Sequence, residues 1–122
     1  MDLVEFLTAR LDEDERAARA ARPGPWSVDG SSVIATHPTD EVVDYTESAD
    51  HIARHDPARV LREVGAKRSL IQRYKQPEES PDLPRSFNKL TAGVERAVLD
   101  EVFRSLALPY ADHPDYDEAW RP

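Results

Sequence analysis

Residues 90–107 read LTAGVERAVLDEVFRSLA, and this stretch decides the fold class. Apolar side chains recur every three or four positions, which is the spacing of one face of an α-helix. The face consists of Leu90, Val94, Val98, Val102 and Leu106, widened by Ala97, Leu99 and Phe103. Pro109 closes the segment, because proline cannot continue a helix. The sequence therefore predicts a long amphipathic helix near the end of the chain.

The same spacing predicts two further long helices, at residues 2–21 and 57–75. The first is stopped by Pro23, Gly24 and Pro25. A short helix, capped by Thr46 or Ser48, is expected to end near His55. Asp56 and Pro57 then separate it from the helix at 57–75, because aspartate suits the N-cap and proline suits the first helical turn. The apolar faces of the two long helices are Leu3, Val4, Phe6, Leu7 and Leu11 in one and Val60, Leu61, Val64, Ile71 and Tyr74 in the other.

A change of period between residues 26 and 45 predicts a small antiparallel β-hairpin. Residues 26–28 and 31–35 flank an Asp29-Gly30 turn, which supplies the positive φ angles of a tight hairpin. Residues 41–45 can add a third strand after a turn at residues 37–40. Because a two-stranded ribbon is only marginally stable alone, we expect it to lie against a helix with Trp26 as its anchor.

With 122 residues and no extreme of composition, the chain suits one domain over residues 1–122. The predicted fold class is mainly α: three to four helices plus a short terminal turn, with the small antiparallel β-hairpin. Residues 76–86 are expected to form a flexible, proline-rich, acidic connection. Tyr116 and Trp120 are four positions apart in the tail, so they can form one helical turn that docks through these two aromatic side chains.

The charge balance disfavours several classes of partner. A net charge of −8 opposes binding to nucleic acid and to anionic lipid. No apolar run has the roughly 20 residues needed to cross a bilayer, and the acidic start lacks the basic region of a signal peptide. The expected location is cytoplasmic. The absence of cysteine excludes disulfides and thiolate chemistry, so a metal would need His, Asp or Glu ligands.

One segment reverses the sign of the charge. Residues 57–76 carry a net charge of +5 in an otherwise acidic chain. These cations either pair with the acidic hairpin and tail of the same chain or bind an acidic protein partner; nucleic acid is the least favoured alternative, since no glycine-rich loop or interleaved aromatic residue accompanies them. The candidate partner-binding residues are Arg59, Arg62, Lys67, Arg68, Arg73 and Lys75.

The histidines suggest a second kind of site. His51 and His55 are four positions apart, so on a helix their imidazoles share one face and can chelate a divalent ion. A third ligand can come from His113, Asp115, His37 or Asp50. The favoured alternative is structural: Asp56 caps the next helix, and His55 lies beside a helix C-terminus. The glutamate of a His-Glu-x-x-His zinc motif is absent, and proton-transfer catalysis lacks a recognisable substrate pocket.

Three stretches resemble a family of short, uncharacterised actinobacterial and actinophage proteins that carries a domain-of-unknown-function label. They read MDLVEFLTAR (1–10), HIARHDPARVLREV (51–64) and LALPYADHPDY (106–116). The resemblance implies a source and a size class but no activity, and residues 76–93 depart from the pattern.

These observations favour a small cytoplasmic, non-catalytic interaction or regulatory protein. It is expected to act through helix faces on a protein partner or on itself, since alanine lets helices approach closely enough for a homodimer through the first or last helix. The resemblance adds a phage or mobile-element association. One alternative is a metal-dependent, hydrolase-like protein using His51, His55 and His113. The other is an acidic nucleic-acid mimic that binds a basic protein and releases it as salt rises.

Overall fold

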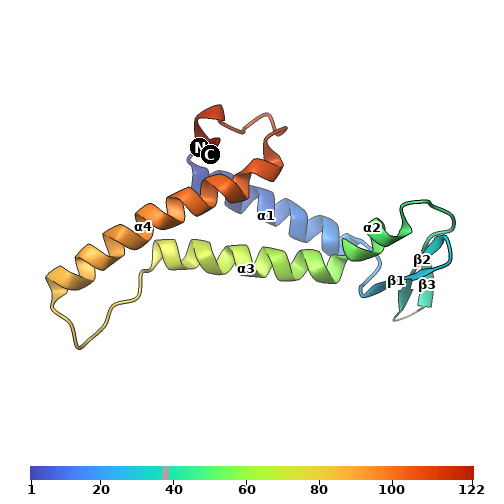
Figure 1. The fold of residues 1–122 in the computed structure, drawn as a ribbon, viewed down its shortest axis with the longest axis horizontal. Helices are drawn as coiled ribbons and strands as arrows, with labels where there is room; N and C mark the ends of the chain where they lie inside the picture. Colours follow the sequence, from blue (N-terminus) through green and yellow to red (C-terminus); the bar gives the residue numbers. More distant parts are fainter. Residues whose placement is uncertain (37–38) are drawn as a thin grey trace. The chain divides into compact units, whose positions relative to one another are not determined.

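The computed structural model describes residues 1–36 and 39–122, and its elements follow the predicted order (Figure 1). The helices are α1 (Leu3–Ala20), α2 (Ala49–Arg54), α3 (Pro57–Lys75) and α4 (Arg85–Ala107). The strands are β1 (Trp26–Asp29), β2 (Ser32–Thr36) and β3 (Thr39–Val43), and two 3₁₀ turns follow α4, η1 (Leu108–Tyr110) and η2 (Glu118–Trp120). The prediction of a mainly α-helical fold with a small antiparallel hairpin is confirmed.

The chain forms two compact units. Met1–Arg10 and Lys67–Pro122 make the first unit, and Leu11–Ala66 makes the second, so α1 and α3 each contribute to both. The folding of the whole chain as one domain stays a prediction, and so does the flexibility of residues 76–86. Over the residues that the structure describes, every helix is too short or too polar to cross a bilayer.

The sheet of the second unit has the order β1-β2-β3, with both pairs antiparallel. Asp29 pairs with Ser32, so Gly30 and Ser31 are the two residues of the turn. Of Asp29, Gly30 and Ser31, Gly30 alone has a positive φ, +62°, which corrects the expectation that Asp29 shares it and matches a turn with glycine at its first central position. Val33 and Ala35 on β2 are buried, which gives the sheet one apolar face.

The buried residues of the second unit come from β2 and from parts of three helices. Its buried apolar residues include Leu11 of α1, Ala49 of α2 and Val64 of α3. Trp26 at the start of β1 donates its indole hydrogen to the carbonyl oxygen of Arg22 at 2.9 Å, just beyond α1. Ser48 precedes α2 as predicted, but its side chain does not cap the helix; its amide donates to Thr46 Oγ1 at 3.0 Å.

In the first unit, α4 returns alongside the C-terminal part of α3 (Figure 1). Phe103 of α4 meets Tyr74 of α3 edge to face at a centroid distance of 5.3 Å. The Arg96 guanidinium lies 5.5 Å from the centre of the same tyrosine ring. Leu99, Phe103 and Ala107 are buried on this side of α4.

α4 begins earlier than its apolar pattern predicts. Its first residue is Arg85, directly after Pro84, so the last two residues of the predicted connection are helical. The side-chain amide of Asn88 holds the connection at Ser80 by two hydrogen bonds. Asn88 Oδ1 accepts from the Ser80 amide at 3.1 Å, and Asn88 Nδ2 donates to the Ser80 carbonyl at 2.9 Å.

Candidate functional site

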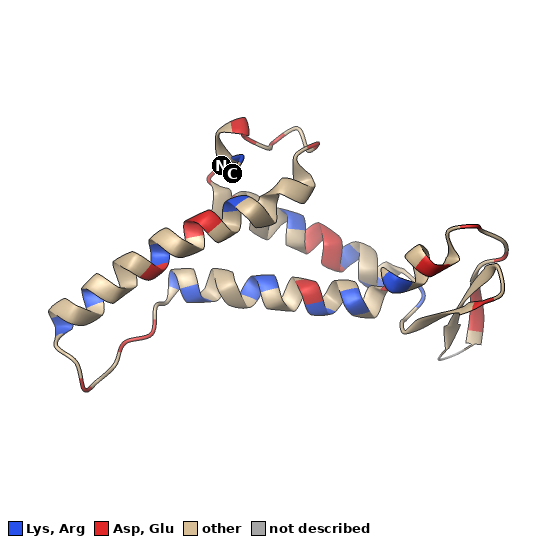
Figure 2. Ribbon diagram, in the orientation of Figure 1, with Lys and Arg blue, Asp and Glu red and all other residues tan. Residues whose placement is uncertain are grey.

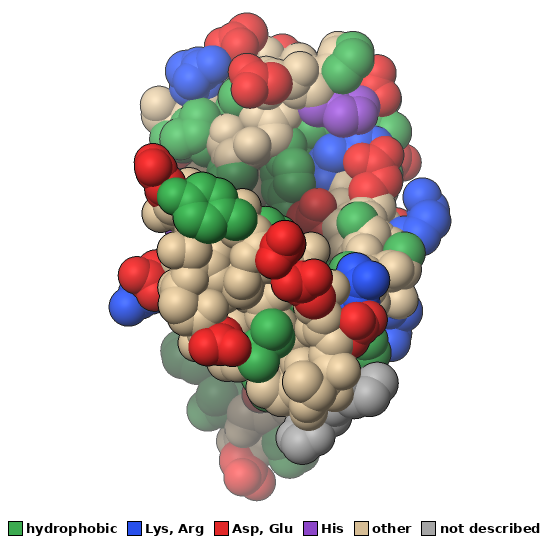
Figure 3. Space-filling view, turned by 90° about the vertical axis from the view of Figure 1, so that its right-hand side faces the viewer, with side chains coloured by type: hydrophobic (Ala, Val, Ile, Leu, Met, Phe, Trp, Pro, Cys, Tyr) green, Lys and Arg blue, Asp and Glu red, His purple; other side chains and the backbone are tan. Residues whose placement is uncertain are grey.

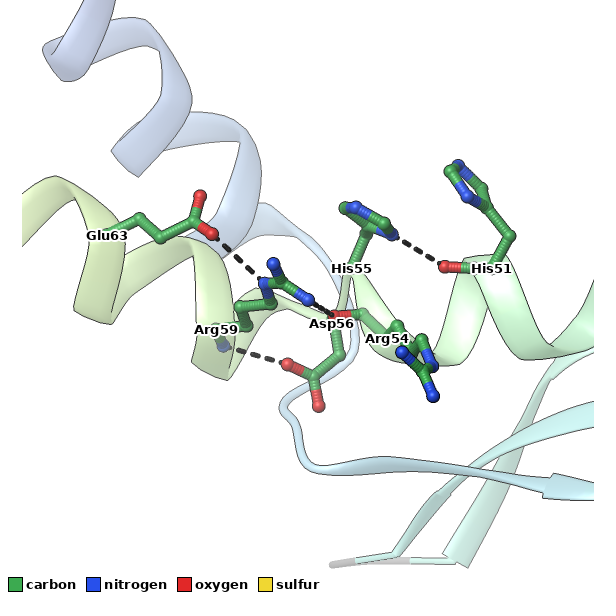
Figure 4. Close-up of polar contacts among 6 residues, drawn as sticks. All are labelled: His51, Arg54, His55, Asp56, Arg59 and Glu63. Atoms are coloured by element: carbon green, nitrogen blue, oxygen red, sulfur yellow. Dashed lines mark hydrogen bonds and ion pairs between the residues drawn. The ribbon is translucent and has the colours of Figure 1, made fainter. Parts of the chain in front are cut away.

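The predicted histidine pair lies on one side of α2 and its C-cap (Figure 4). The rings of His51 and His55 are stacked at a slight tilt, with centroids 4.4 Å apart. His55 Nδ1 lies 2.8 Å from the His51 carbonyl oxygen. Because a carbonyl can only accept, His55 Nδ1 is the donor in this hydrogen bond. Both histidines are exposed, and the hydrogen bond from His55 to the His51 carbonyl oxygen lies at the C-terminal end of α2.

Asp56 occupies the junction between α2 and α3 and is buried. Its Oδ1 accepts the amide hydrogen of Arg59 at 2.8 Å, which is the helix cap that the Asp-Pro sequence predicts. Its Oδ2 accepts the amide hydrogen of Trp26 at 2.9 Å and so ties the start of the sheet to the start of α3. A Cβ at Gly24 would lie 3.0 Å from Oδ2 and 2.9 Å from the Ala58 Cβ. The two backbones approach here because residue 24 has no side chain.

His113 and Asp115 belong to the other unit. His113 Nδ1 accepts the Asp115 amide hydrogen at 3.0 Å, and Nε2 faces the guanidinium of Arg10. Among the described residues, no three His, Cys, Asp or Glu side chains are grouped as metal ligands. His37 lies outside the described residues. The structure therefore pairs His51 with His55 and His113 with Asp115, and a metal at either pair stays a hypothesis.

The six cations proposed for partner binding recur along α3 (Figure 2). Ion pairs within the chain include those of Arg59 and Arg73. Arg59 Nε lies 3.0 Å from Glu63 Oε1, while Arg73 lies 2.9 Å from Glu78 and 2.5 Å from Glu95. These carboxylates come from α3, the connection and α4, and not from the hairpin or tail that the charge pattern indicated. Partner binding by this set stays a hypothesis.

Acidic side chains gather around the sheet and α2 (Figure 3). Among them, Asp40 Oδ2 lies 2.5 Å from Arg22 Nε, and the hydrogen bond from Arg22 holds the pKa of Asp40 below its usual value. The hydrogen bond with Asp44, followed by the charge of Asp44, raises the pKa of Glu41. Their exposure fits the acidic-mimic hypothesis, which no contact in the structure tests. The exposed acids are Asp29, Asp40, Glu41, Asp44, Glu47 and Asp50.

The tail packs on α1 around one phenylalanine. Phe6 is fully buried, and four rings of the tail lie within 6.4 Å of its own ring, centroid to centroid. Tyr116 and Trp120 meet edge to face at 5.8 Å, so the predicted docking of this turn is seen, with Phe6 as the unpredicted partner. We call this cluster the aromatic clasp: Phe6, Tyr110, His113, Tyr116 and Trp120.

The opposite situation holds on α4, where an apolar face is exposed. Its four large residues repeat at intervals of three and four positions, so they share one side of the helix. An amphipathic stripe normally enters the core, but here the buried side is the one with Leu99 and Phe103. We call this surface the α4 face: Phe87 (46% exposed), Leu90 (64%), Val94 (59%) and Val98 (58%).

A groove of about 760 Å³ borders the N-terminal half of α4. It is lined by the connection and by three cations of α4, Arg85, Lys89 and Arg96. Glu79 lies in the same lining and offsets part of that charge. The groove widens the accessible surface beside the α4 face.

Comparison with known proteins identifies the family and nothing more. No curated protein and no solved structure matches the sequence. One family, described as a family of unknown function (DUF6221), matches residues 1–122, which is the whole sequence. This agrees with the resemblance seen in the sequence, and the chain belongs to the DUF6221 family.

Proposed function

We propose that this chain is a small, non-catalytic binding protein whose working surface is the α4 face. The single observation that carries the proposal is the exposure of four large apolar side chains in one continuous row. Scattered apolar residues are normal on protein surfaces, but a contiguous row marks a docking site for another apolar surface. Three turns of α4 present this row over about 16 Å.

The non-catalytic part of the proposal rests on what the polar candidates do. Asp56 holds two backbone amides, and His55 donates to the carbonyl of His51. His113 is engaged by Arg10 and by the amide of Asp115. These hydrogen bonds give each of the residues a structural role, so none of them needs a catalytic role to account for its position. We further propose a cytoplasmic location and an association with phage or mobile elements, the latter supported by the resemblance to actinophage proteins.

Site-specific photo-crosslinking in the cells that produce the protein tests the binding surface. A photoreactive phenylalanine analogue replaces Leu90 in one variant. It replaces Gln72, an exposed residue of α3, in the matched control. We expect one adduct of discrete mass from position 90 and none from position 72. Adding Val94→Glu should remove the adduct, because a charge in the row opposes apolar docking.

The same experiment can reject the proposal. If position 90 gives no discrete adduct, the α4 face does not bind another protein under those conditions of expression. If positions 72 and 90 give the same adducts, contact is unspecific and the α4 face has no special role. An adduct that survives Val94→Glu has the same consequence, provided that the variant is folded.

A further inference from the structure

We propose that the groove beside the N-terminal half of α4 binds an acidic segment of a partner protein in extended conformation. This site is additional to the α4 face and does not depend on the proposed function. The groove measures about 760 Å³, which lies within the usual size range of ligand pockets. All of its lining belongs to the unit made of Met1–Arg10 and Lys67–Pro122, so a single unit builds the site.

Three cations share the side of α4 that lines the groove. Lys89 follows Arg85 by four positions and Arg96 follows Lys89 by seven, which is the spacing of one helical side. Arg85 precedes Val94 by nine positions, or two and a half turns, so these cations lie opposite the centre of the α4 face. We call this surface the basic side of α4: Arg85, Lys89 and Arg96 (Figure 2).

The same side of α4 enters the core in its C-terminal half. Leu99 and Phe103 continue the spacing of the basic side, and both are buried. Phe103 there contacts Tyr74 of α3, but α3 ends at Lys75. Beside the N-terminal half of α4 the groove is lined by the connection instead of a helix. One side of α4 is therefore covered in its second half and forms a basic groove in its first.

Within the part of the chain that the structure describes, the basic side has no acidic partner. Other cations of this unit are paired, since Arg73 meets Glu78 and Glu95, and Arg104 meets Asp100. Over residues 1–36 and 39–122, no carboxylate forms an ion pair with the basic side. The chain has 24 acidic and 16 basic residues, so acids are not scarce. Cations gathered in a groove without them favour an acidic ligand from outside.

Two sets of contacts order the groove before a ligand binds. The Arg96 guanidinium lies 5.5 Å from the centre of the Tyr74 ring, a cation–π contact that limits its freedom. Two hydrogen bonds between Asn88 and Ser80 hold the connection, whose residues form the other wall. Groups that are already ordered lose less conformational entropy on binding. The groove is therefore prepared for a ligand that supplies carboxylates.

The spacing of the cations fits the side chains of an extended peptide. Lys89 lies about 6 Å beyond Arg85 along the helix axis, and Arg96 lies about 10 Å beyond Lys89. Alternate side chains of an extended peptide are about 7 Å apart and point to the same side. Two alternate acidic residues can therefore meet Arg85 and Lys89, and continued alternation brings further carboxylates toward Arg96. Arginine adds strength because it binds a carboxylate through two parallel hydrogen bonds.

The surrounding charge favours a short acidic segment over nucleic acid. Three cations and Glu79 give the lining a net charge of +2, which suits a ligand with few charges. Nucleic acid carries phosphates far beyond the groove, where a chain of net charge −8 repels them. A short peptide stays within the groove, and at about 0.15 M salt charges more than about 8 Å away are largely screened. The proposed ligand is therefore a protein segment with alternating acidic residues.

Fluorescence anisotropy of the full chain tests this site. The probe is a labelled peptide in which glutamate alternates with glycine over about eight residues. We expect saturable binding that weakens as salt rises, and none by a peptide with glutamine in place of glutamate. Arg85→Gln combined with Lys89→Gln should weaken binding at least about threefold. Arg62→Gln combined with Lys67→Gln removes the same charge from α3 and should leave the dissociation constant unchanged.

Several outcomes would overturn the inference, provided that circular dichroism shows each variant to be folded. One is the absence of saturable binding up to about 1 mM peptide. Another is equal weakening by the two double variants, which would assign binding to overall charge instead of the groove. A labelled single-stranded DNA of equal charge that binds more tightly than the peptide would make this a phosphate site. The proposed function is decided separately, by photo-crosslinking at position 90.

Discussion

Phe6 and Leu90 sit on helices with the same apolar spacing, yet their surroundings differ completely. Phe6 is fully buried under the aromatic clasp, whereas Leu90 is 64% exposed. Both lie in the unit made of Met1–Arg10 and Lys67–Pro122. Periodicity shows which side of a helix is apolar, but it does not show what covers that side. The difference between the two helices lies in the tail, which supplies four rings to α1.

The largest expected effect compares the two faces directly. Phe6→Ala should lower the free energy of unfolding by about 3–5 kcal/mol, because it leaves a cavity under the tail rings. Val94→Ala should change it by less than about 0.5 kcal/mol in dilute protein, because the valine is more than half exposed. Urea unfolding followed by Trp120 fluorescence in a Trp26→Phe background reports on the surroundings of Phe6. Equal losses from the two variants would refute the contrast.

The second largest effect compares a buried and an exposed polar residue in the unit Leu11–Ala66. Asp56→Ala removes a helix cap and leaves the partly buried Trp26 amide without its acceptor, which should cost about 2–3 kcal/mol. Arg59→Ala removes an exposed ion pair with Glu63 and should cost less than about 0.5 kcal/mol. Trp26 fluorescence in a Trp120→Phe background is the measurement. Asp56→Asn should recover part of the loss, since Oδ1 is retained; no recovery would point to charge as the source.

Local signals in the sequence were sufficient for most elements. Pro57 and the apolar residues after it place α3 at residues 57–75, as observed. Asp56 before proline predicts the cap, because a cap depends on neighbours a few positions away. The turn at Gly30 is predicted for the same reason, although its two central residues are Gly30 and Ser31 and not Asp29 and Gly30.

Contacts between distant segments could not be obtained this way. Nothing near Phe6 in the sequence indicates Trp120, and nothing near Trp26 indicates Asp56. Such pairs depend on how the chain folds back, which one sequence without relatives does not reveal. The α4 face illustrates the same limit, since its pattern gave the helix but not the side that enters the core. The histidines divide between two units for the same reason.

A third, smaller effect concerns the start of α4, where buried Asn88 and exposed Phe87 are neighbours. Asn88→Ala removes both hydrogen bonds to Ser80 and should cost about 1–2 kcal/mol. Hydrogen exchange of the Ser80 amide should accelerate in this variant. Ser86→Ala, an exposed change on the same turn, is the control. Unchanged exchange at Ser80 would show that Asn88 does not hold the connection in solution.

The smallest effect lies on the surface of the other unit, where Arg22 pairs with Asp40. The hydrogen bond from Arg22 lowers the pKa of Asp40 from the usual 3.8. A carboxyl with a lowered pKa stabilises the folded state above that usual value and loses this contribution as the pH falls through the lowered pKa. Arg22→Gln should therefore raise the pKa of Asp40 in an NMR titration.

The pKa of Glu41 is shifted in the opposite direction, and the same NMR titration measures it. Its pKa is raised by the hydrogen bond with Asp44, so Asp44→Asn should lower the pKa of Glu41. Both shifts should shrink in high salt, because the groups are exposed and their charges are screened. A pKa of Asp40 that does not respond to Arg22→Gln would mean that this ion pair does not form in solution. Exposed charge pairs on this surface would then add as little to folding as the exposed valine does on α4.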